Sequence, residues 1–89
     1  MNDGAKHKRG IDEGSDFFEE FNAFSARLRR KILSLRKEKK LTQEQMEAFE
    51  LTLRQFQRIE SGETTNPTLA NLFKIAKALG VSPSQLLDI

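Results

Sequence analysis

Four side chains able to pair with DNA bases lie within five consecutive residues of this chain: Arg54, Gln55, Gln57 and Arg58. Arginine pairs bidentately with guanine, and glutamine with adenine, along the major-groove edges of base pairs. Phe56 and Ile59 are spaced i, i+3 and predict an apolar face that turns inward and leaves the four polar side chains outside. The pattern indicates a short helix that presents base-reading groups to double-stranded DNA.

The residues around this segment predict a second helix directly before it. Thr42 with Gln45 has capping-box spacing, and Thr52 is a suitable N-cap for a helix over residues 53–60. Almost no linker separates the two helices. A helix-turn-helix is therefore the first hypothesis.

Composition argues against other classes of function. At 89 residues and 37% apolar content the chain fits one small domain, with no cysteine for a disulfide or a thiolate metal site. His7 stands alone, and no acid pair, nucleophile–base set or glycine-rich phosphate loop occurs. We expect no enzyme activity, no cofactor and no metal. No apolar run approaches a membrane span, which predicts a cytoplasmic protein without membrane contact.

The net charge of +2 conceals two segments of opposite sign. Residues 27–40 hold eight basic side chains and one acidic one, which gives +7, whereas residues 16–25 hold three acidic side chains and no base, which gives −3. Two interpretations of the basic block are open: a surface that faces a polyanion, or a solvated helix face.

The N-terminal quarter divides into a tail and a helix. Residues 1–15 carry too few apolar side chains to stay ordered, so we predict a disordered tail, whose Lys6, Lys8 and Arg9 could touch phosphate. From Asp16, capped with Glu19, helical spacing predicts a long amphipathic helix, with a break at Ser25 as the alternative. Its apolar stripe is Phe17, Phe21, Phe24, Leu28, Ile32 and Leu35, with Phe18 alongside.

Two further helices are predicted after the polar stretch at 63–66. Thr68 caps the first, with Leu69, Leu72, Phe73, Ile75, Ala76 and Leu79 expected inward, and Gly80 ends it. Ser82, Pro83 and Gln85 open a short last helix that carries Leu86 and Leu87. The fold class is therefore all-α, with five helices.

The block from about residue 24 to residue 89 resembles the phage-repressor-like, Cro/C1-type (XRE) helix-turn-helix family. The motifs that carry the resemblance are the Ile32, Leu35, Arg36 run, Leu41-Thr42-Gln43-Glu44, Ile59-Glu60-x-Gly62, Asn66-Pro67-Thr68-Leu69, and residues 75–82. The resemblance implies a five-helix, lambda-repressor-like DNA-binding domain over residues 16–89. Residues 16–24 are then an N-terminal helical extension that the family domain does not need.

The resemblance also implies roles for single residues. Thr42 and Gln43 would contact phosphate and could also reach the first base. Asn66 and Thr68 would contact phosphate, and Leu53 would meet a thymine methyl group. Arg36 and Glu60 would form a structural ion pair between the long helix and the 53–60 helix. The candidate DNA-binding residues are Thr42, Gln43, Thr52, Leu53, Arg54, Gln55, Gln57, Arg58, Asn66 and Thr68.

The chain also departs from the family pattern. The helix from Thr42 and its turn are one residue shorter than usual, and Glu50 stands at the turn position of a glycine, where a left-handed backbone would strain it. Met46, Ala48 and Phe49 are expected in the core.

We expect a small repressor that binds a palindromic operator as a homodimer, because one such module makes few base contacts. Antitoxins and restriction–modification controllers share this class. A different class is a protein-interaction module that docks a partner through the helix from Phe17 to Phe24. That stripe could instead cap the domain's own core, which we favour, or join two chains. The other candidate dimer surface is Val81, Leu86, Leu87 and Ile89.

Overall fold

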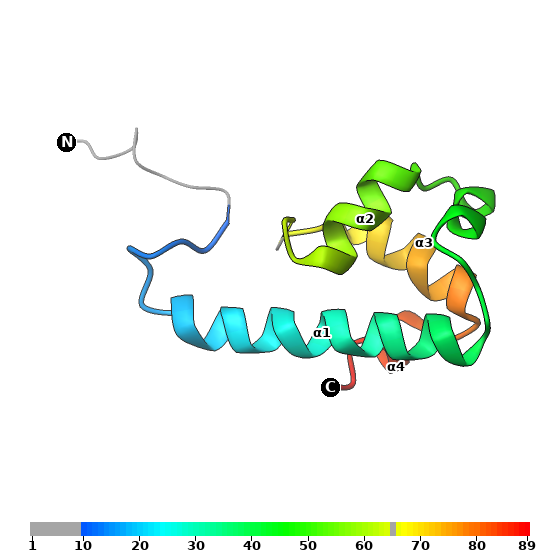
Figure 1. The fold of residues 1–89 in the computed structure, drawn as a ribbon. Coiled ribbons are helices and arrows are strands. Elements are labelled where there is room, and N and C mark those ends of the chain that lie inside the picture. The colour runs from blue at the N-terminus through cyan, green and yellow to red at the C-terminus, as the bar shows by residue number, and fades with distance from the viewer. Residues whose placement is uncertain (1–9, 65) are drawn as a thin grey trace.

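The computed structural model describes residues 10–64 and 66–89. Residues 1–9 lie outside the described part, and with them most of the expected tail, including Lys6, His7, Lys8 and Arg9. All regular structure in the described part is helical, as expected from the sequence. Its elements are α1 (Phe18–Glu38), the 3₁₀ helix η2 (Glu44–Phe49), α2 (Leu53–Ser61), α3 (Leu69–Leu79) and α4 (Pro83–Leu86) (Figure 1).

Helix α1 is one unbroken rod of 21 residues, so the alternative break at Ser25 does not occur. Ser25 is instead buried within the helix. The expected cap at Asp16 is wrong, because the helix begins at Phe18 and no side chain caps it from the N-cap residue Phe17. Ser15 instead accepts hydrogen bonds at the start of the helix. Its Oγ accepts from the Phe17 amide at 3.0 Å, and its carbonyl accepts from the Phe18 amide at 3.2 Å.

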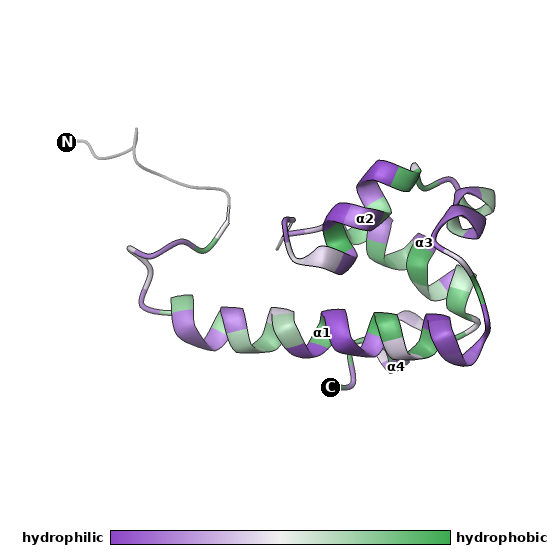
Figure 2. Ribbon diagram, in the orientation of Figure 1, coloured by the Kyte–Doolittle hydropathy of each residue, from purple (hydrophilic) through white to green (hydrophobic). Residues whose placement is uncertain are grey.

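The core lies where the middle and C-terminal turns of α1 meet α2, α3 and α4, with η2 packed on α2 and α3. Its fully buried side chains come from every element: Ile32, Met46, Leu51, Phe56, Ile75, Leu79 and Leu86. In Figure 2, α3 is mostly hydrophobic and α2 largely hydrophilic, which matches a helix buried among its neighbours and one that lies at the surface. Leu86 was a candidate for the dimer surface, and its complete burial shows that this was wrong.

Helix α3 buries only one of its apolar faces. Ile75 and Leu79 are fully buried, but Leu69 is 80% exposed and Phe73 is 51% exposed, so the expectation that these two point inward is wrong. Apolar residues surround more of this helix than one packing face can cover. Ala48 on η2 is likewise exposed rather than part of the core.

The 3₁₀ form of η2 follows from the short segment between α1 and α2. The Gln45 amide donates to the Thr42 carbonyl at 3.2 Å and the Met46 amide to the Gln43 carbonyl at 3.1 Å, both i→i−3 bonds. A 3₁₀ helix rises about 2.0 Å per residue against about 1.5 Å in an α-helix. Fewer residues therefore cover the same distance, which accommodates the shortened helix noted in the sequence.

The turn after η2 confirms the strained backbone expected at Glu50. Its φ of 67° and ψ of 28° are left-handed, a conformation that favours glycine. The Lys74 Nζ on α3 donates to the Glu50 carbonyl at 3.1 Å and fixes the turn. A second non-glycine residue, Lys40, has φ of 58° after the end of α1.

Basic side chains of α1 and of its C-cap residue Lys39 lie at the C-terminal ends of three other helices. Gly62 ends α2, and a Cβ placed on it would lie 2.8 Å from the Arg29 Cζ. Gly80 ends α3, and a Cβ placed on it would lie 3.0 Å from the Lys39 Nζ. Lys31 donates through Nζ to the main-chain carbonyls of Gln85 and Asp88 at the end of α4. A cation at a helix C-terminus offsets the negative end of the helix dipole. These three members of the basic block are therefore structural.

The N-terminal turns of α1 project beyond the other helices (Figure 1). Phe17 is 62% exposed and Phe24 is 37% exposed. Among the described residues, neither they nor Phe18 and Phe21 belong to the core cluster or pack against it. The expectation that this stripe caps the domain's own core is wrong. Within residues 10–64 and 66–89, no helix has the length and apolarity that crossing a membrane requires.

Candidate nucleic-acid interface

Two reciprocal capping boxes fix the start of η2 and of α2. The Thr42 amide donates to Gln45 Oε1 at 2.7 Å, and the Gln45 amide to Thr42 Oγ1 at 3.1 Å. Thr52 and Gln55 repeat this arrangement at 3.1 and 3.0 Å. Each box satisfies amides that a helix N-terminus leaves without partners. The two helix starts, where candidate phosphate contacts lie, are thereby held rigidly.

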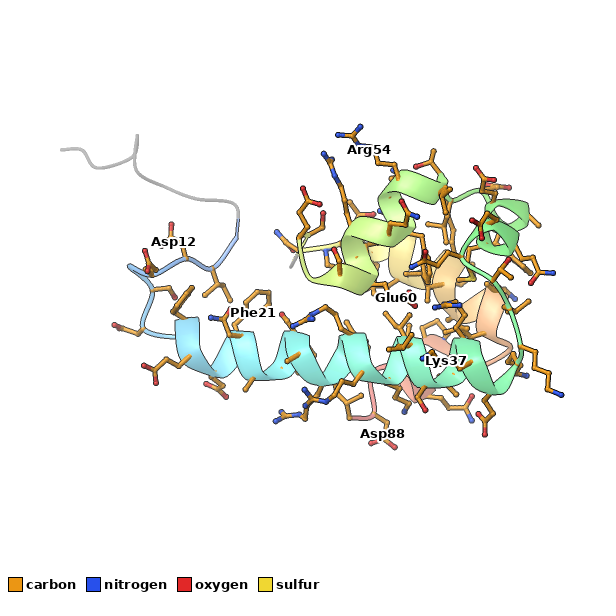
Figure 3. All side chains as sticks on the ribbon, in the orientation of Figure 1. Asp12, Phe21, Lys37, Arg54, Glu60 and Asp88 are labelled. Carbon is orange, nitrogen blue, oxygen red and sulfur yellow. The ribbon has the colours of Figure 1, made fainter. Side chains whose placement is uncertain are left out.

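Helix α2 separates its core residues from its polar residues. Phe56 is fully buried and Ile59 is 3% exposed. Arg54 points away from α1, whereas Glu60 lies between α2 and α1 (Figure 3). The outer surface is a shallow hollow of about 510 Å³. Its lining residues are Arg54, Gln57, Arg58, Ser61 and Glu63.

This hollow brings three of the candidate base-reading side chains onto one polar face. Arg54, Gln57 and Arg58 stand at i, i+3 and i+4 and so project on the same side of the helix. Leu53 is half-buried at the first turn. Gln55 and Thr52 are both exposed, but the box uses the Gln55 Oε1 and the Thr52 Oγ1, so these two side chains position the helix first.

An ion pair anchors α2 to α1 beneath this face. Arg36 donates through Nε to Glu60 Oε2 at 2.8 Å and through Nη2 to Oε1 at 3.0 Å. The two side chains are only 13% and 7% exposed. Arg36 Nη1 also donates to the Leu41 carbonyl at 2.7 Å. One guanidinium therefore holds together α1, the segment before η2, and α2.

Gln43 connects this anchor to the reading face. Its Nε2 donates to Glu60 Oε1 at 2.7 Å, and its Oε1 accepts from Gln57 Nε2 at 3.3 Å. Gln43, which we expect to contact phosphate, thus also orients Gln57, which we expect to read a base. Sequence spacing does not indicate this link, because Gln43 is the N-cap of η2, Gln57 lies on α2, and their separation depends on the angle between the two helices.

Arg58 is engaged differently from Arg54. Its Nε lies 3.6 Å from Glu63 Oε2, and the two side chains are 42% and 65% exposed. Exposed pairs of this kind contribute about 0–1 kcal/mol. Glu63 therefore leaves the Arg58 guanidinium able to exchange partners.

The loop before α3 carries the last two candidates. Thr68 Oγ1 accepts from the Asn71 amide at 3.0 Å and so caps α3. Asn66 is exposed, and a Cβ placed on Gly10 would lie 3.6 Å from its Nδ2. The N-terminal segment therefore approaches the chain beside this loop. In the described part of the chain, no group of three or more His, Cys, Asp or Glu residues is arranged to hold a metal ion.

These features define a helix-turn-helix unit with a polar, positively charged second helix at its surface. A family model described as helix-turn-helix matches residues 32–86, more than half of the chain. The chain belongs to the Cro/C1-type, phage-repressor-like helix-turn-helix family, and its general class is that of sequence-specific DNA-binding regulators. No curated protein and no solved structure gave a significant match.

Proposed function

We propose that the chain is a small transcriptional repressor that binds a palindromic operator as a homodimer and reads each half-site with α2 in the major groove. The observation that carries this proposal is the outward polar face of Arg54, Gln57 and Arg58 on a helix locked to α1 by the ion pair. A regulator of this kind acts on the chromosome of its cell, and we place it in the cytoplasm.

Each side chain of the face has a proposed role. Arg54, which points away from α1 (Figure 3), pairs with a guanine, and Gln57, oriented by Gln43, pairs with an adenine. Arg58 exchanges Glu63 for a second guanine or a phosphate. The half-buried Leu53 contacts a thymine methyl group.

The flanking residues are proposed to fix the register of the helix on the duplex. Thr42 and Gln43 face phosphate at the start of η2, Thr52 and Gln55 at the start of α2, and Asn66 and Thr68 in the loop before α3. Phosphate contacts of this type set position without reading sequence. The helix N-termini add a favourable field for the negative backbone.

A dimer supports specificity that a single copy does not. One α2 offers three or four base contacts, and each good bidentate pair is worth about 1–3 kcal/mol of discrimination. Two copies with half-sites about 34 Å apart double the readout on one face of the duplex. Blocking polymerase at such a site needs no further domain, so repression is the simplest mode of action.

The test is affinity for a selected duplex in a series of salt concentrations. Arg54→Ala and Arg58→Ala should each weaken specific binding by about 1–3 kcal/mol and relax one base position per half-site. The matched control is Arg30→Ala, because Arg30 is exposed on α1 and belongs to neither the reading face nor the core. An unchanged motif and affinity in either α2 variant would show that the proposed register is wrong.

A second candidate is a protein-interaction module that docks a partner through the helix from Phe17 to Phe24. The exposure of Phe17 and Phe24 favours it. This module would show neither a steep salt dependence nor a preference for one duplex. Antitoxins and restriction–modification controllers remain within the proposed DNA-binding class, and a neighbouring toxin or methylase gene distinguishes them.

A further inference from the structure

Besides the exposed phenylalanine stripe on α1, the described residues form an apolar groove between η2 and α3. It has a volume of about 610 Å³, and its apolar walls are Ala48, Phe49, Leu69, Ala70 and Phe73. Leu69 and Phe73 are 80% and 51% exposed. Exposed apolar side chains gathered in one groove are typical of an interaction site.

The groove has a basic edge. Lys74 and Lys77 line it, and Lys77 Nζ lies 5.6 Å from the centre of the Phe73 ring. Glu50 also lines the groove, but α3 itself carries these two lysines and no acidic residue. An occupant with aromatic side chains and carboxylates would complement this surface.

The N-terminal extension has that chemistry. Residues 16–24 contain three acidic side chains and no basic one. Phe17, Phe21 and Phe24 line a hollow of about 270 Å³ on the extension, together with Ile11, Glu20 and Arg27. Glu19 and Glu20 are exposed within the same two turns of helix.

The extension is not placed to reach the groove of its own chain. Helix α1 is continuous from Phe18 to Glu38 and about 30 Å long, at about 1.5 Å per residue, so its first turns cannot fold back onto α3. Figure 1 shows these turns beyond the end of the other helices, while η2 lies near the opposite end of α1. The complementary extension must therefore come from another molecule.

We propose that the aromatic, acidic extension of one copy packs into the η2–α3 groove of a second copy, and that the second copy returns the same contact. One phenylalanine buries about 150–250 Å² at most, and a stable interface needs about 800 Å² from each partner. A single extension supplies too little area, and two reciprocal contacts double it. Reciprocity also closes the dimer, whereas one-way contacts would continue into a filament. The inference names the interface of the proposed homodimer and rests on that part of the proposed function.

The test measures mass without DNA, by sedimentation equilibrium of the full chain. The extension variant is Phe17→Ser, the groove variant is Leu69→Ser with Phe73→Ser, and all three side chains are at least half exposed. Each variant alone should raise the dimer dissociation constant about tenfold or more, as expected for removal of a central apolar anchor. Circular dichroism melts establish that each variant is folded; if one is not, Glu19→Lys with Glu20→Lys, or Lys77→Glu, replaces it with the same expectation.

The decisive sample is an equimolar mixture of the two variants. Its heterodimer keeps one intact contact, from the unchanged extension to the unchanged groove, and should be tighter than either variant with itself. A groove variant that dimerises like the wild type would overturn the proposal, since the extension would then pair with itself or with another protein. A wild-type chain that stays monomeric at about 100 μM, far above a useful affinity, would overturn it as well. Either failure leaves DNA reading by α2 untouched, because that depends on Arg54 and Arg58 and is measured separately.

Discussion

Removing either member of the Arg36–Glu60 pair should destabilise the domain severely. Glu60→Ala leaves a guanidinium that is 13% exposed with only the Leu41 carbonyl, and Arg36→Ala leaves a carboxylate that is 7% exposed with only Gln43. Breaking a buried pair from one side costs about 3–5 kcal/mol, because the remaining charge is desolvated and unpaired. A small domain has about 5–15 kcal/mol of stability in total, so each single variant should approach unfolding.

The double variant removes both charges, and its cost should therefore be smaller than the sum of the two single costs. Urea unfolding of the wild type, the two single variants and the double variant gives the interaction energy. We expect a coupling of about 1–3 kcal/mol, the upper part of the range for residues in one network. The measurement is made at one pH and salt concentration, without DNA.

A matched control pair joins α2 to the loop that follows it. Arg58 and Glu63 lie 3.6 Å apart with side chains 42% and 65% exposed, and their coupling should be about 0–1 kcal/mol. A coupling between Arg36 and Glu60 below about 0.5 kcal/mol would refute the reasoning that this pair anchors α2 to α1.

Four further changes test the backbone and the tail. Glu50→Gly should stabilise the domain by about 0.5–1 kcal/mol by relieving the left-handed strain, and Lys40→Gly should act in the same direction. Thermal melts should show a melting temperature several degrees higher for each variant. A lower melting temperature for both variants would contradict the strain argument. Gly62→Ala should destabilise the domain by about 1–2 kcal/mol or more, since φ is 89° and the new Cβ would meet the Arg29 Cζ at 2.8 Å. An unchanged urea midpoint would show that the backbone at residue 62 and the Arg29 side chain adapt without cost. Deleting residues 1–9 should leave the selected DNA motif unchanged and make the salt dependence shallower, by up to about 0.9 in slope for each lost phosphate contact; a changed motif would mean that the tail reads bases.

Local chemistry made much of the fold predictable. Thr52, Thr68 and Ser82 each cap a helix as expected, because an N-cap depends only on residues within one turn. Gly80 ends α3 with φ of 71° for the same reason. The inward face of α2 also followed from spacing, since Phe56 and Ile59 stand at i, i+3 and are buried together on one side of the helix.

The remaining features depend on what lies opposite each helix. Leu69 and Phe73 fit the helical period of a buried face, yet they line the open groove between η2 and α3 and stay exposed. Leu86 resembled a surface residue near the end of the chain, and the α1–α3 junction encloses it. The positions of Lys31 and Arg29 at helix ends could likewise not be predicted, because a run of basic residues does not indicate which helix ends its side chains will lie against.

Selection of bound duplexes from a random DNA pool is the sharpest test of whether α2 reads DNA sequence through its outer face. We predict that the wild-type chain enriches one motif with two-fold symmetry, and that Arg54→Ala enriches the same motif with one base position relaxed in each half. Enrichment of no motif, or of an identical motif by the wild type and the variant, would contradict the claim.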